Sequence, residues 1–340
     1  MNIFPSTSSN FAMQSVVNAC RPARPVIKIL RAAHMGMCFG VRDAIALAEE
    51  ESRRQPLTIL GELVHNDSVL NDLRERGINI EEQAAAVKTS AVMITAHGAS
   101  EKTMERVRER GLHVLEATCP LVHHAHSAVQ RLVREHYHPV IIGRRGHVEV
   151  RGLTEDLEEF DIVLTDADVE QLAERPRFGI AAQTTQPIEK VRRLVGLIRQ
   201  RFSGSEVKFI DTVCQPTKQR QAAAIELAQQ SEVVIVVGGE HSNNTRELAA
   251  TCQTYCKRVY HVQGAGNLRA EWFDGAARVG ITAGTSTPDL IIQMVQQWLE
   301  AKLNPVNTSP LPETQNRHVD NIREAGVALG SGTDPSQRRG

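Results

Sequence analysis

Short apolar runs alternate along the chain with segments whose apolar residues recur at helical spacing. Nine runs of β-branched and aliphatic residues, each bounded by Gly, His, Asn or Thr, predict strands; LTIL, PVII and VVIVV are examples. The segments between them, such as VRDAIALAEEE and IEKVRRLVGLIRQRF, place apolar residues three and four apart and predict helices. Strands that alternate with helices are typical of α/β domains.

Three cysteines occupy matching places in this pattern. Cys38, Cys119 and Cys214 each follow a predicted strand and precede a predicted helix, and two of them stand in the related phrases EATCP and DTVCQP. After each helix a second strand ends in polar residues, in VHN, GHVE or HSNN, and a later strand ends in TAHG, AQTT or AGTS. Because the same order recurs, the chain is predicted to contain three units of roughly 80 to 95 residues.

The repeats predict the domain boundaries. We expect three small α/β domains, related by a pseudo-threefold axis in a trefoil, at residues 26–119, 120–210 and 211–303. The first strand, within 26–38, is able to pack with the third domain instead of the first. Residues 1–25 carry Ser, Pro and Arg but no acid and predict a flexible leader, with a weaker indication of a targeting segment. Residues 304–340 have little periodicity and predict a disordered tail.

Polar residues gather at the predicted carboxyl ends of the strands. Ligands of open α/β sheets bind at these ends, where loops and helix N-termini converge. If the three units meet around one axis, their three thiols converge on one point. The side chains expected to ring that point are His65, His97, His147, Glu149, Thr184, Ser242, Asn244 and Ser286.

Three cysteines without a fourth indicate a particular kind of metal centre. Iron–sulfur clusters are held by thiolates, usually four for a [4Fe–4S] cluster, so three would leave one iron open to a substrate. A zinc ion with three cysteines and a water is the competing interpretation, but zinc sites usually take two ligands from a short CxxC pair, and this chain has none. Three unrelated buried thiols are the remaining alternative.

Composition and charge narrow the classes of ligand and compartment. Lys and Arg (39) nearly balance Asp and Glu (40), which argues against a protein that binds nucleic acid through its phosphates. The sequence has no apolar run long enough for a transmembrane helix and no P-loop. Six cysteines in so long a chain favour a reducing compartment, which we expect to be the cytoplasm. An anion must therefore be bound locally, and His65, His97 and His147 with nearby Ser, Thr and Asn could hold a diphosphate.

Glu149 is the candidate proton donor. It stands two residues after His147 at a predicted strand end, so an extended backbone would turn both side chains toward the same cavity. A carboxyl group screened from water can keep its proton at neutral pH and act as a general acid. The alternative is a surface acid paired with Arg144, Arg145 or Arg151.

Nine segments, in the same order along residues 26–303, resemble the 4-hydroxy-3-methylbut-2-enyl diphosphate reductase (LytB) family. Each segment alone is weak, but nine in series are specific. They are GMCFGVRDAI, GELVHN, AHGAS, EATCPLV, GHVEVRG, QTTQP, DTVCQPTKQRQ, HSNNTREL and ITAGTSTPD.

The resemblance implies an iron–sulfur enzyme that reductively removes a hydroxyl group. Its products would be isopentenyl and dimethylallyl diphosphate, in the last step of the methylerythritol phosphate route to isoprenoids, with ferredoxin or flavodoxin as electron donor. It implies a [4Fe–4S] cluster on Cys38, Cys119 and Cys214, and a proton relayed by Glu149 with Thr184. The substrate would be held by His65, His97, His147, Thr184, Ser242, Asn244 and Ser286.

The chain departs from the family pattern at a few positions. Val148, Asn243 and Pro216 stand where the family has Pro, Ser and a small residue. A divergent relative could be an iron–sulfur sensor of ligand or redox state, or a cluster-dependent dehydratase without net electron flow. The presence of Glu149 and Thr184 favours the reductase, because binding alone requires neither.

Overall fold

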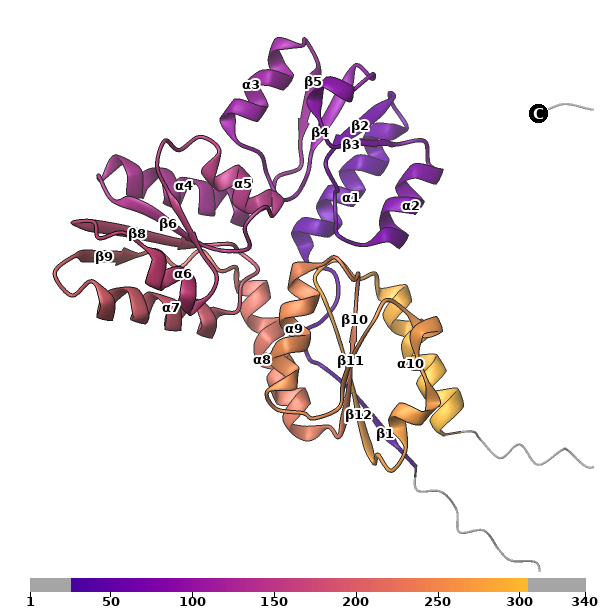
Figure 1. The fold of residues 1–340 in the computed structure, drawn as a ribbon. Helices are drawn as coiled ribbons and strands as arrows, with labels where there is room; N and C mark the ends of the chain where they lie inside the picture. The colour runs from indigo at the N-terminus through magenta and orange to yellow at the C-terminus, as the bar shows by residue number, and fades with distance from the viewer. Residues whose placement is uncertain (1–25, 305–340) are drawn as a thin grey trace, which may run out of the picture. The chain divides into compact units, whose positions relative to one another are not determined.

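The computed structural model describes residues 26–304, which form three lobes, each with a four-stranded parallel sheet between helices (Figure 1). The prediction of three small α/β domains is confirmed. The predicted leader and all of the predicted tail except Asn304 lie outside the described residues. The domain boundaries themselves stay a prediction. No helix within 26–304 combines the length and apolar character needed to cross a membrane.

The first lobe contains the sheet β3-β2-β4-β5 and three helices. Its sheet is apolar on both faces, because α1 and α2 cover one side through residues such as Ala48 and Leu70, while Val107 of α3 packs on Val92 on the other. The elements are α1 (Phe39–Ser52), β2 (Leu57–Leu60), α2 (Asp67–Glu75), β3 (Asn79–Glu81), the 3-10 helix η1 (Ala84–Ala86), β4 (Ala91–Ile94), α3 (Glu101–Glu109) and β5 (His113–Glu116).

The second lobe repeats this plan with the sheet β7-β6-β8-β9. Val191 and Leu194 of α7 pack on one face, and Val129 and Leu132 of α4 pack on the other. The elements are α4 (Pro120–Arg134), β6 (His138–Ile142), α5 (Val148–Thr154), β7 (Asp161–Val163), α6 (Asp166–Gln171), β8 (Arg177–Ala182), α7 (Ile188–Arg201) and β9 (Glu206–Phe209).

The third lobe takes its fourth strand from the other end of the chain. In the sheet β11-β10-β12-β1, the N-terminal strand β1 pairs in parallel with β12, with Lys28 opposite Arg278. β1 thus fills the edge position that β5 and β9 fill in the other sheets. The elements are β1 (Lys28–Arg31), α8 (Gln215–Gln230), β10 (Val233–Val237), α9 (Asn243–Gln253), β11 (Val259–Val262), η2 (Ala265–Asn267), η3 (Ala270–Phe273), β12 (Arg278–Ala283) and α10 (Asp289–Leu303).

Three strands were absent from the nine that the apolar runs predict. β3, β7 and β11 are the same edge strand in each lobe, and each pairs with only one neighbour. They are three or four residues long and partly exposed, so they need no long apolar run. The sequence pattern detected the six central strands and the edge strands β1, β5 and β9, and it overlooked the opposite edge of each sheet.

We expect Gly280→Ala to destabilise the third lobe. In β12 a methyl group at Gly280 would lie 2.5 Å from Ser231 Oγ and 2.8 Å from Leu227 Cγ. The C-terminal end of α8, where these two residues lie, would have to shift. Overpacking of this kind costs about 1 to 3 kcal/mol.

The matched control is Gly196→Ala on the exposed face of α7, where a methyl group would meet no atom within 4 Å. Removing a glycine from a helix interior there should stabilise the protein by about 0.5 to 1 kcal/mol. Chemical unfolding of both variants checks the pair; equal stabilities would contradict the packing described here.

Candidate active site

The three predicted cysteine ligands occupy equivalent positions in the three lobes. Each is the residue before the first turn of a helix, at the start of α1, α4 and α8. Each donates its backbone N–H to a carbonyl two residues beyond the end of β12, β4 or β8. The hydrogen bonds are Cys38 to Thr285 (3.1 Å), Cys119 to Ala96 (3.1 Å) and Cys214 to Thr184 (3.0 Å).

The fold brings these cysteines from distant parts of the chain into one region. A Cβ atom at Gly40 would lie 2.6 Å from Cys119 Sγ, so the first turn of α1 rests directly on that sulfur. Burial raises the pKa of Cys119 and of Cys214, and Cys38 raises both further. All three thiols are free. A set of three sulfur donors suits an iron–sulfur cluster or another thiolate-bound metal, and these residues could hold one.

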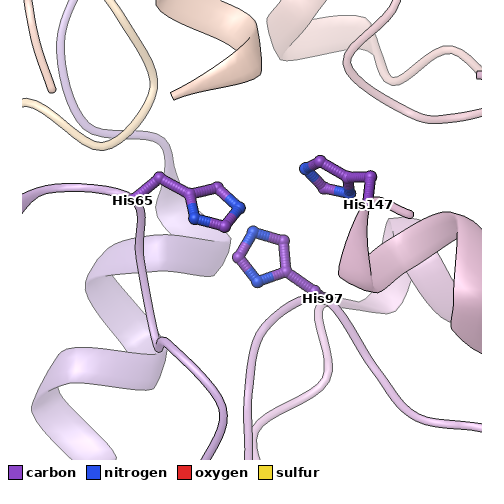
Figure 2. Close-up of side chains that lie close together, drawn as sticks. All are labelled: His65, His97 and His147. Carbon is purple, nitrogen blue, oxygen red and sulfur yellow. The ribbon is translucent and has the colours of Figure 1, made fainter. Parts of the chain in front are cut away.

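His65, His97 and His147 form a cluster at the meeting point of the first two lobes. Figure 2 shows the three rings turned toward one another, with centroids 5.0 to 5.6 Å apart. Burial and the two neighbouring rings lower the pKa of His97 well below its usual value, and burial followed by His65 lowers that of His147 to about 3. Two of the three imidazoles are therefore neutral at pH 7 in the free protein.

Hydrogen bonding decides what the histidine cluster can bind. Their nitrogens lie within 4.8 Å of one another, a spacing at which three histidines could hold a metal ion. However, Nδ1 of His147 accepts the backbone N–H of Glu149, so its Nε2 carries the hydrogen and has no lone pair for a metal. Nδ1 of His65 bonds to the Glu62 carboxylate at 2.8 Å, so its Nε2 can donate only in the charged form. Because His147 has no lone pair to offer, the three histidines do not form a three-ligand metal site, and the charged form of His65 and the Nε2 hydrogen of His147 suit an anion.

The other predicted substrate-binding side chains line the same small cavity as the histidines. Ser242, Asn244 and Ser286 of the third lobe face it, and its volume is about 40 Å³. Asn244 Oδ1 accepts the N–H of Thr285, and Ser242 Oγ accepts that of Thr245, which leaves their hydrogens free. Ser286 Oγ is buried without a partner among the described residues. The cavity thus presents hydrogen-bond donors from all three lobes without a Lys or Arg in its lining.

Glu149 and Thr184 connect the histidines with the cysteines: the Glu149 N–H donates to His147, and the Thr184 carbonyl accepts the N–H of Cys214. Glu149 is 1% exposed, and its carboxylate oxygens accept the backbone N–H of Thr184 at 2.6 Å and its hydroxyl at 3.0 Å. Burial raises the pKa of Glu149 to about 7 against these two hydrogen bonds. Neither residue lines the 40 Å³ cavity, but Glu149 acts electrostatically on Cys119 and Cys214. The carboxyl group can therefore carry a proton near neutral pH beside the thiols.

One expectation about Glu149 was wrong, and the alternative that was left open is excluded. The residues around it do not form an extended strand end, because His147 caps α5 and Glu149 lies in the first turn of that helix. Its alternative role as a surface acid is excluded by its burial, and it makes no ion pair with Arg144, Arg145 or Arg151. The side chain reaches the site because a helix starts there, which the short segment GHVEVRG did not indicate.

The structure also identifies Asn66, which the sequence interpretation had passed over. The residues that cap α2, α5 and α9 are Asn66, His147 and Ser242, and each follows its lobe's cysteine by 28 residues. The equivalent of His147 in the first lobe is thus Asn66 and not His65. Asn66 Nδ2 donates to the carbonyl of Ser286, which ties the first lobe to the third at the cavity. The constant spacing of 28 was the signal that could have found it.

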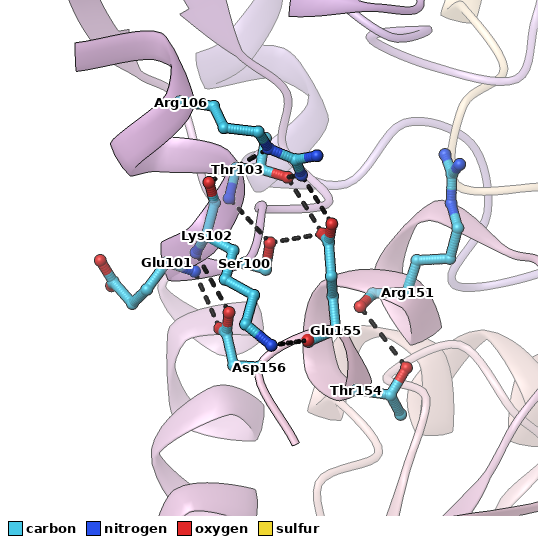
Figure 3. A network of polar contacts seen from close by, with 9 residues as sticks. All are labelled: Ser100, Glu101, Lys102, Thr103, Arg106, Arg151, Thr154, Glu155 and Asp156. Atoms are coloured by element: carbon cyan, nitrogen blue, oxygen red, sulfur yellow. Dashed lines mark hydrogen bonds and ion pairs between the residues drawn. The ribbon is translucent and has the colours of Figure 1, made fainter. Parts of the chain in front are cut away.

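A polar network fixes α5 to the first lobe (Figure 3). The Asp156 carboxylate, just beyond α5, accepts the backbone N–H groups of Glu101 and Lys102 at 2.8 and 3.1 Å, at the N-terminus of α3. Glu155 accepts a hydrogen bond from Ser100 and forms an ion pair with Arg106 at 2.6 Å. A negative charge at a helix N-terminus is favourable. The C-terminal end of the helix that carries Glu149 is therefore held to the first lobe.

Comparison with known proteins gives a consistent result. The family model described as LytB protein matches residues 29–300. Proteins named 4-hydroxy-3-methylbut-2-enyl diphosphate reductase from Aquifex aeolicus (strain VF5) and Trichlorobacter lovleyi are 38% and 36% identical to this chain. The matches cover 81% of this chain in both cases, and 96% and 98% of the relatives.

Two solved structures resemble the fold. The E-1-hydroxy-2-methyl-but-2-enyl-4-diphosphate reductase from Plasmodium falciparum has a TM-score of 0.77 at 27% identity, covering 83% of this chain and 90% of that one. A second, described as (E)-4-hydroxy-3-methyl-but-2-enyl diphosphate reductase, the terminal enzyme of the non-mevalonate pathway, has a TM-score of 0.59 at 38% identity, covering 81% of this chain and 99% of that one.

Glu149→Gln should change how the stability of the protein depends on pH. The unfolded glutamate has a pKa near 4.5 and the folded one about 7, so its protonated form stabilises the fold at low pH, and this contribution is lost as the pH rises between those values. Glutamine stays neutral. Between about pH 5 and about pH 8 the free energy of unfolding should therefore shift in favour of the variant by up to about 3 kcal/mol.

Urea unfolding of both proteins at several pH values measures this shift. A difference between the two proteins that stays constant from acid to alkaline pH would mean that Glu149 does not hold a proton in the folded state.

Proposed function

The chain belongs to the LytB family, and on this premise we propose that it is a 4-hydroxy-3-methylbut-2-enyl diphosphate reductase that forms isopentenyl and dimethylallyl diphosphate. One observation carries the proposal: three equivalent cysteine N-caps lie beside a buried carboxyl group and a cavity lined by hydrogen-bond donors. The reaction removes a hydroxyl group as water and takes up two electrons and two protons. Glu149 could supply one of these protons, and a cluster held by the three cysteines could supply the electrons.

The donor-lined cavity is the proposed site of the substrate diphosphate. Ser242, Asn244 and Ser286 donate from the third lobe, and His65, His97 and His147 donate from the first two. A bound anion favours the charged form of an imidazole and so offsets the burial that lowers the pKa of His97 and His147 in the free protein. A volume of 40 Å³ has room for only about three water molecules, so the lining must open for the substrate to enter.

Glu149 is the proposed proton donor to the departing hydroxyl group. Its pKa of about 7 keeps part of the population protonated at neutral pH, the condition for a general acid. The two hydrogen bonds from Thr184 fix the orientation of the carboxyl group. The carbonyl of Thr184 also accepts a hydrogen bond from the backbone N–H of Cys214. One residue therefore positions both the acid and a cysteine.

Cys38, Cys119 and Cys214 are the proposed ligands of a [4Fe–4S] cluster. With three cysteine ligands, such a cluster supplies an iron with an open coordination position and a store for single electrons. The thiols come from three separate lobes and no two are close in sequence, unlike the short ligand pairs of structural zinc sites. We propose ferredoxin or flavodoxin as the electron donor. We place the enzyme in the cytoplasm, because free cysteines suit a reducing compartment.

Anaerobic turnover of the allylic alcohol diphosphate tests the function. The purified protein should contain about four irons per chain and form both products only when a reductant is supplied. Turnover without a reductant would instead support a dehydratase, and a loaded cluster without turnover under either condition would support a sensor. Glu149→Gln should keep the cluster absorption spectrum and lose about 100-fold or more in rate. A variant with near-normal rate would remove Glu149 from the mechanism.

Ser286→Ala should weaken diphosphate binding without loss of stability. Its hydroxyl has no partner among residues 26–304, so the substitution breaks no hydrogen bond in the free protein and should leave the melting temperature equal or higher. Loss of one hydrogen bond to a charged ligand should raise the inhibition constant of inorganic diphosphate about tenfold. His124→Ala, on the exposed side of α4, is the matched control and should change neither value. An unchanged constant for Ser286→Ala would exclude this hydroxyl from the diphosphate site.

A further inference from the structure

Arg220 is a buried cation without a carboxylate partner. It lies in the second turn of α8 and is 8% exposed. Within residues 26–304 it forms no ion pair, and its guanidinium donates to two backbone carbonyls, from Nε to Gly36 at 2.9 Å and from Nη1 to Pro216 at 3.0 Å. Burying a charge without an opposite charge is unfavourable. A nearby negative charge would therefore stabilise Arg220, and no carboxylate of residues 26–304 supplies it.

Both carbonyl partners belong to segments that hold a cysteine. Gly36 precedes Cys38 by two residues, and Pro216 follows Cys214 by two. The guanidinium thus joins the segment before α1 to the first turn of α8, which lie far apart in the sequence. Burial lowers the pKa of Arg220, whereas Cys38 and Cys214 act on it in the opposite direction. These two thiols are the nearby groups that can supply negative charge.

Thr217 adds a second contact on the same side of α8. It is fully buried, and its hydroxyl lies 3.0 Å from Cys214 Sγ. Thr217 and Arg220 are three residues apart, so they lie on one face of the helix. Hydrogen bonds to cysteine sulfur and fixed charge nearby are among the factors that set the reduction potential of an iron–sulfur cluster.

We propose that Arg220 is the positioning residue that fixes Cys38 relative to Cys214 and that its charge offsets the negative charge of the cysteine-bound cluster. This inference rests on the proposed cluster. Three thiolates around a cluster core of charge +2 give a net charge of −1, and a one-electron reduction makes it −2. A buried positive charge favours the reduced form more than the oxidised form, because the attraction grows with the charge. Arg220 therefore makes the cluster easier to reduce.

The first test measures the reduction potential of the cluster in the full-length protein. Arg220→Gln should lower the equilibrium constant for one-electron reduction at least tenfold, a shift of about 59 mV toward more negative potential. Arg220→Lys keeps the charge but not the two-carbonyl contact, so its potential should lie close to wild type. Arg42→Gln is the matched control: Arg42 is exposed, paired with Asp289 at 3.4 Å, and its loss should change the constant less than twofold.

The second test uses the cluster-free full-length protein and does not require the proposed function. Alkylation of each cysteine by iodoacetamide is followed by mass spectrometry at one fixed pH. Because a nearby cation favours the reactive thiolate, Arg220→Gln should slow Cys38 and Cys214 at least threefold. Cys119, on which Arg220 has no resolved influence, should react at an unchanged rate and serves as the internal comparison.

The outcomes separate the two proposals. A wild-type protein that binds no iron would contradict the proposed function, while the alkylation rates would still decide the role of Arg220. A loaded Arg220→Gln protein with wild-type potential, or equal rates at all three cysteines, would overturn the inference about charge. If Arg220→Gln does not fold, as thermal unfolding would reveal, Arg220→Lys decides: slowed alkylation at Cys38 and Cys214 in that variant would likewise contradict a role for the charge.

Discussion

The site depends on one backbone hydrogen bond that is made three times. Each cysteine starts the first helix of one lobe and donates its amide N–H to the carbonyl two residues past a central strand of another lobe, so the position of the sulfur is set by that sheet and not by a flexible loop. The same strand order in the three sheets then fixes three sulfurs in equivalent orientations. Gly40, whose missing side chain leaves room for Cys119 Sγ, allows the lobes to come this close.

What the site can bind depends on which of its hydrogen-bonding atoms already have a partner within the protein. His147, Asn244 and Ser242 each accept a backbone N–H, so what they offer to a ligand is a donor. Glu149, in contrast, accepts hydrogen bonds through its side chain. Because it is buried, its pKa is raised to about 7, so it can keep a proton near neutral pH. A neutral, donor-lined cavity beside a protonated acid can bind an anion and still deliver a proton. A lysine-lined site would lower the pKa of that acid and weaken its ability to keep the proton.

Much of the fold and of the site could be predicted, because the residues that recur in the three repeats are cysteines, histidines and other side chains with a chemical role. The cysteines, the histidines and the buried strands stand out at regular spacing, and they led to the three lobes and the family. The edge strands β3, β7 and β11 and helix α5 were not predicted, since short, partly exposed elements carry no strong apolar period. Arg220 was also missed, because an arginine in a polar helix is expected to be exposed; its burial and its hydrogen bond to the Gly36 carbonyl arise only in the folded chain.

The parallel pairing of β1 with β12 has a consequence for biosynthesis. The strand that leads to Cys38 is made first, but its only neighbour in the sheet is completed some 250 residues later, at Arg278–Ala283. Until the ribosome has released that segment, the first sulfur has no fixed place, whereas the strands of the middle lobe can pair as soon as they emerge. A cluster bound by all three cysteines would therefore be completed only after β1 and β12 have paired, near the end of translation.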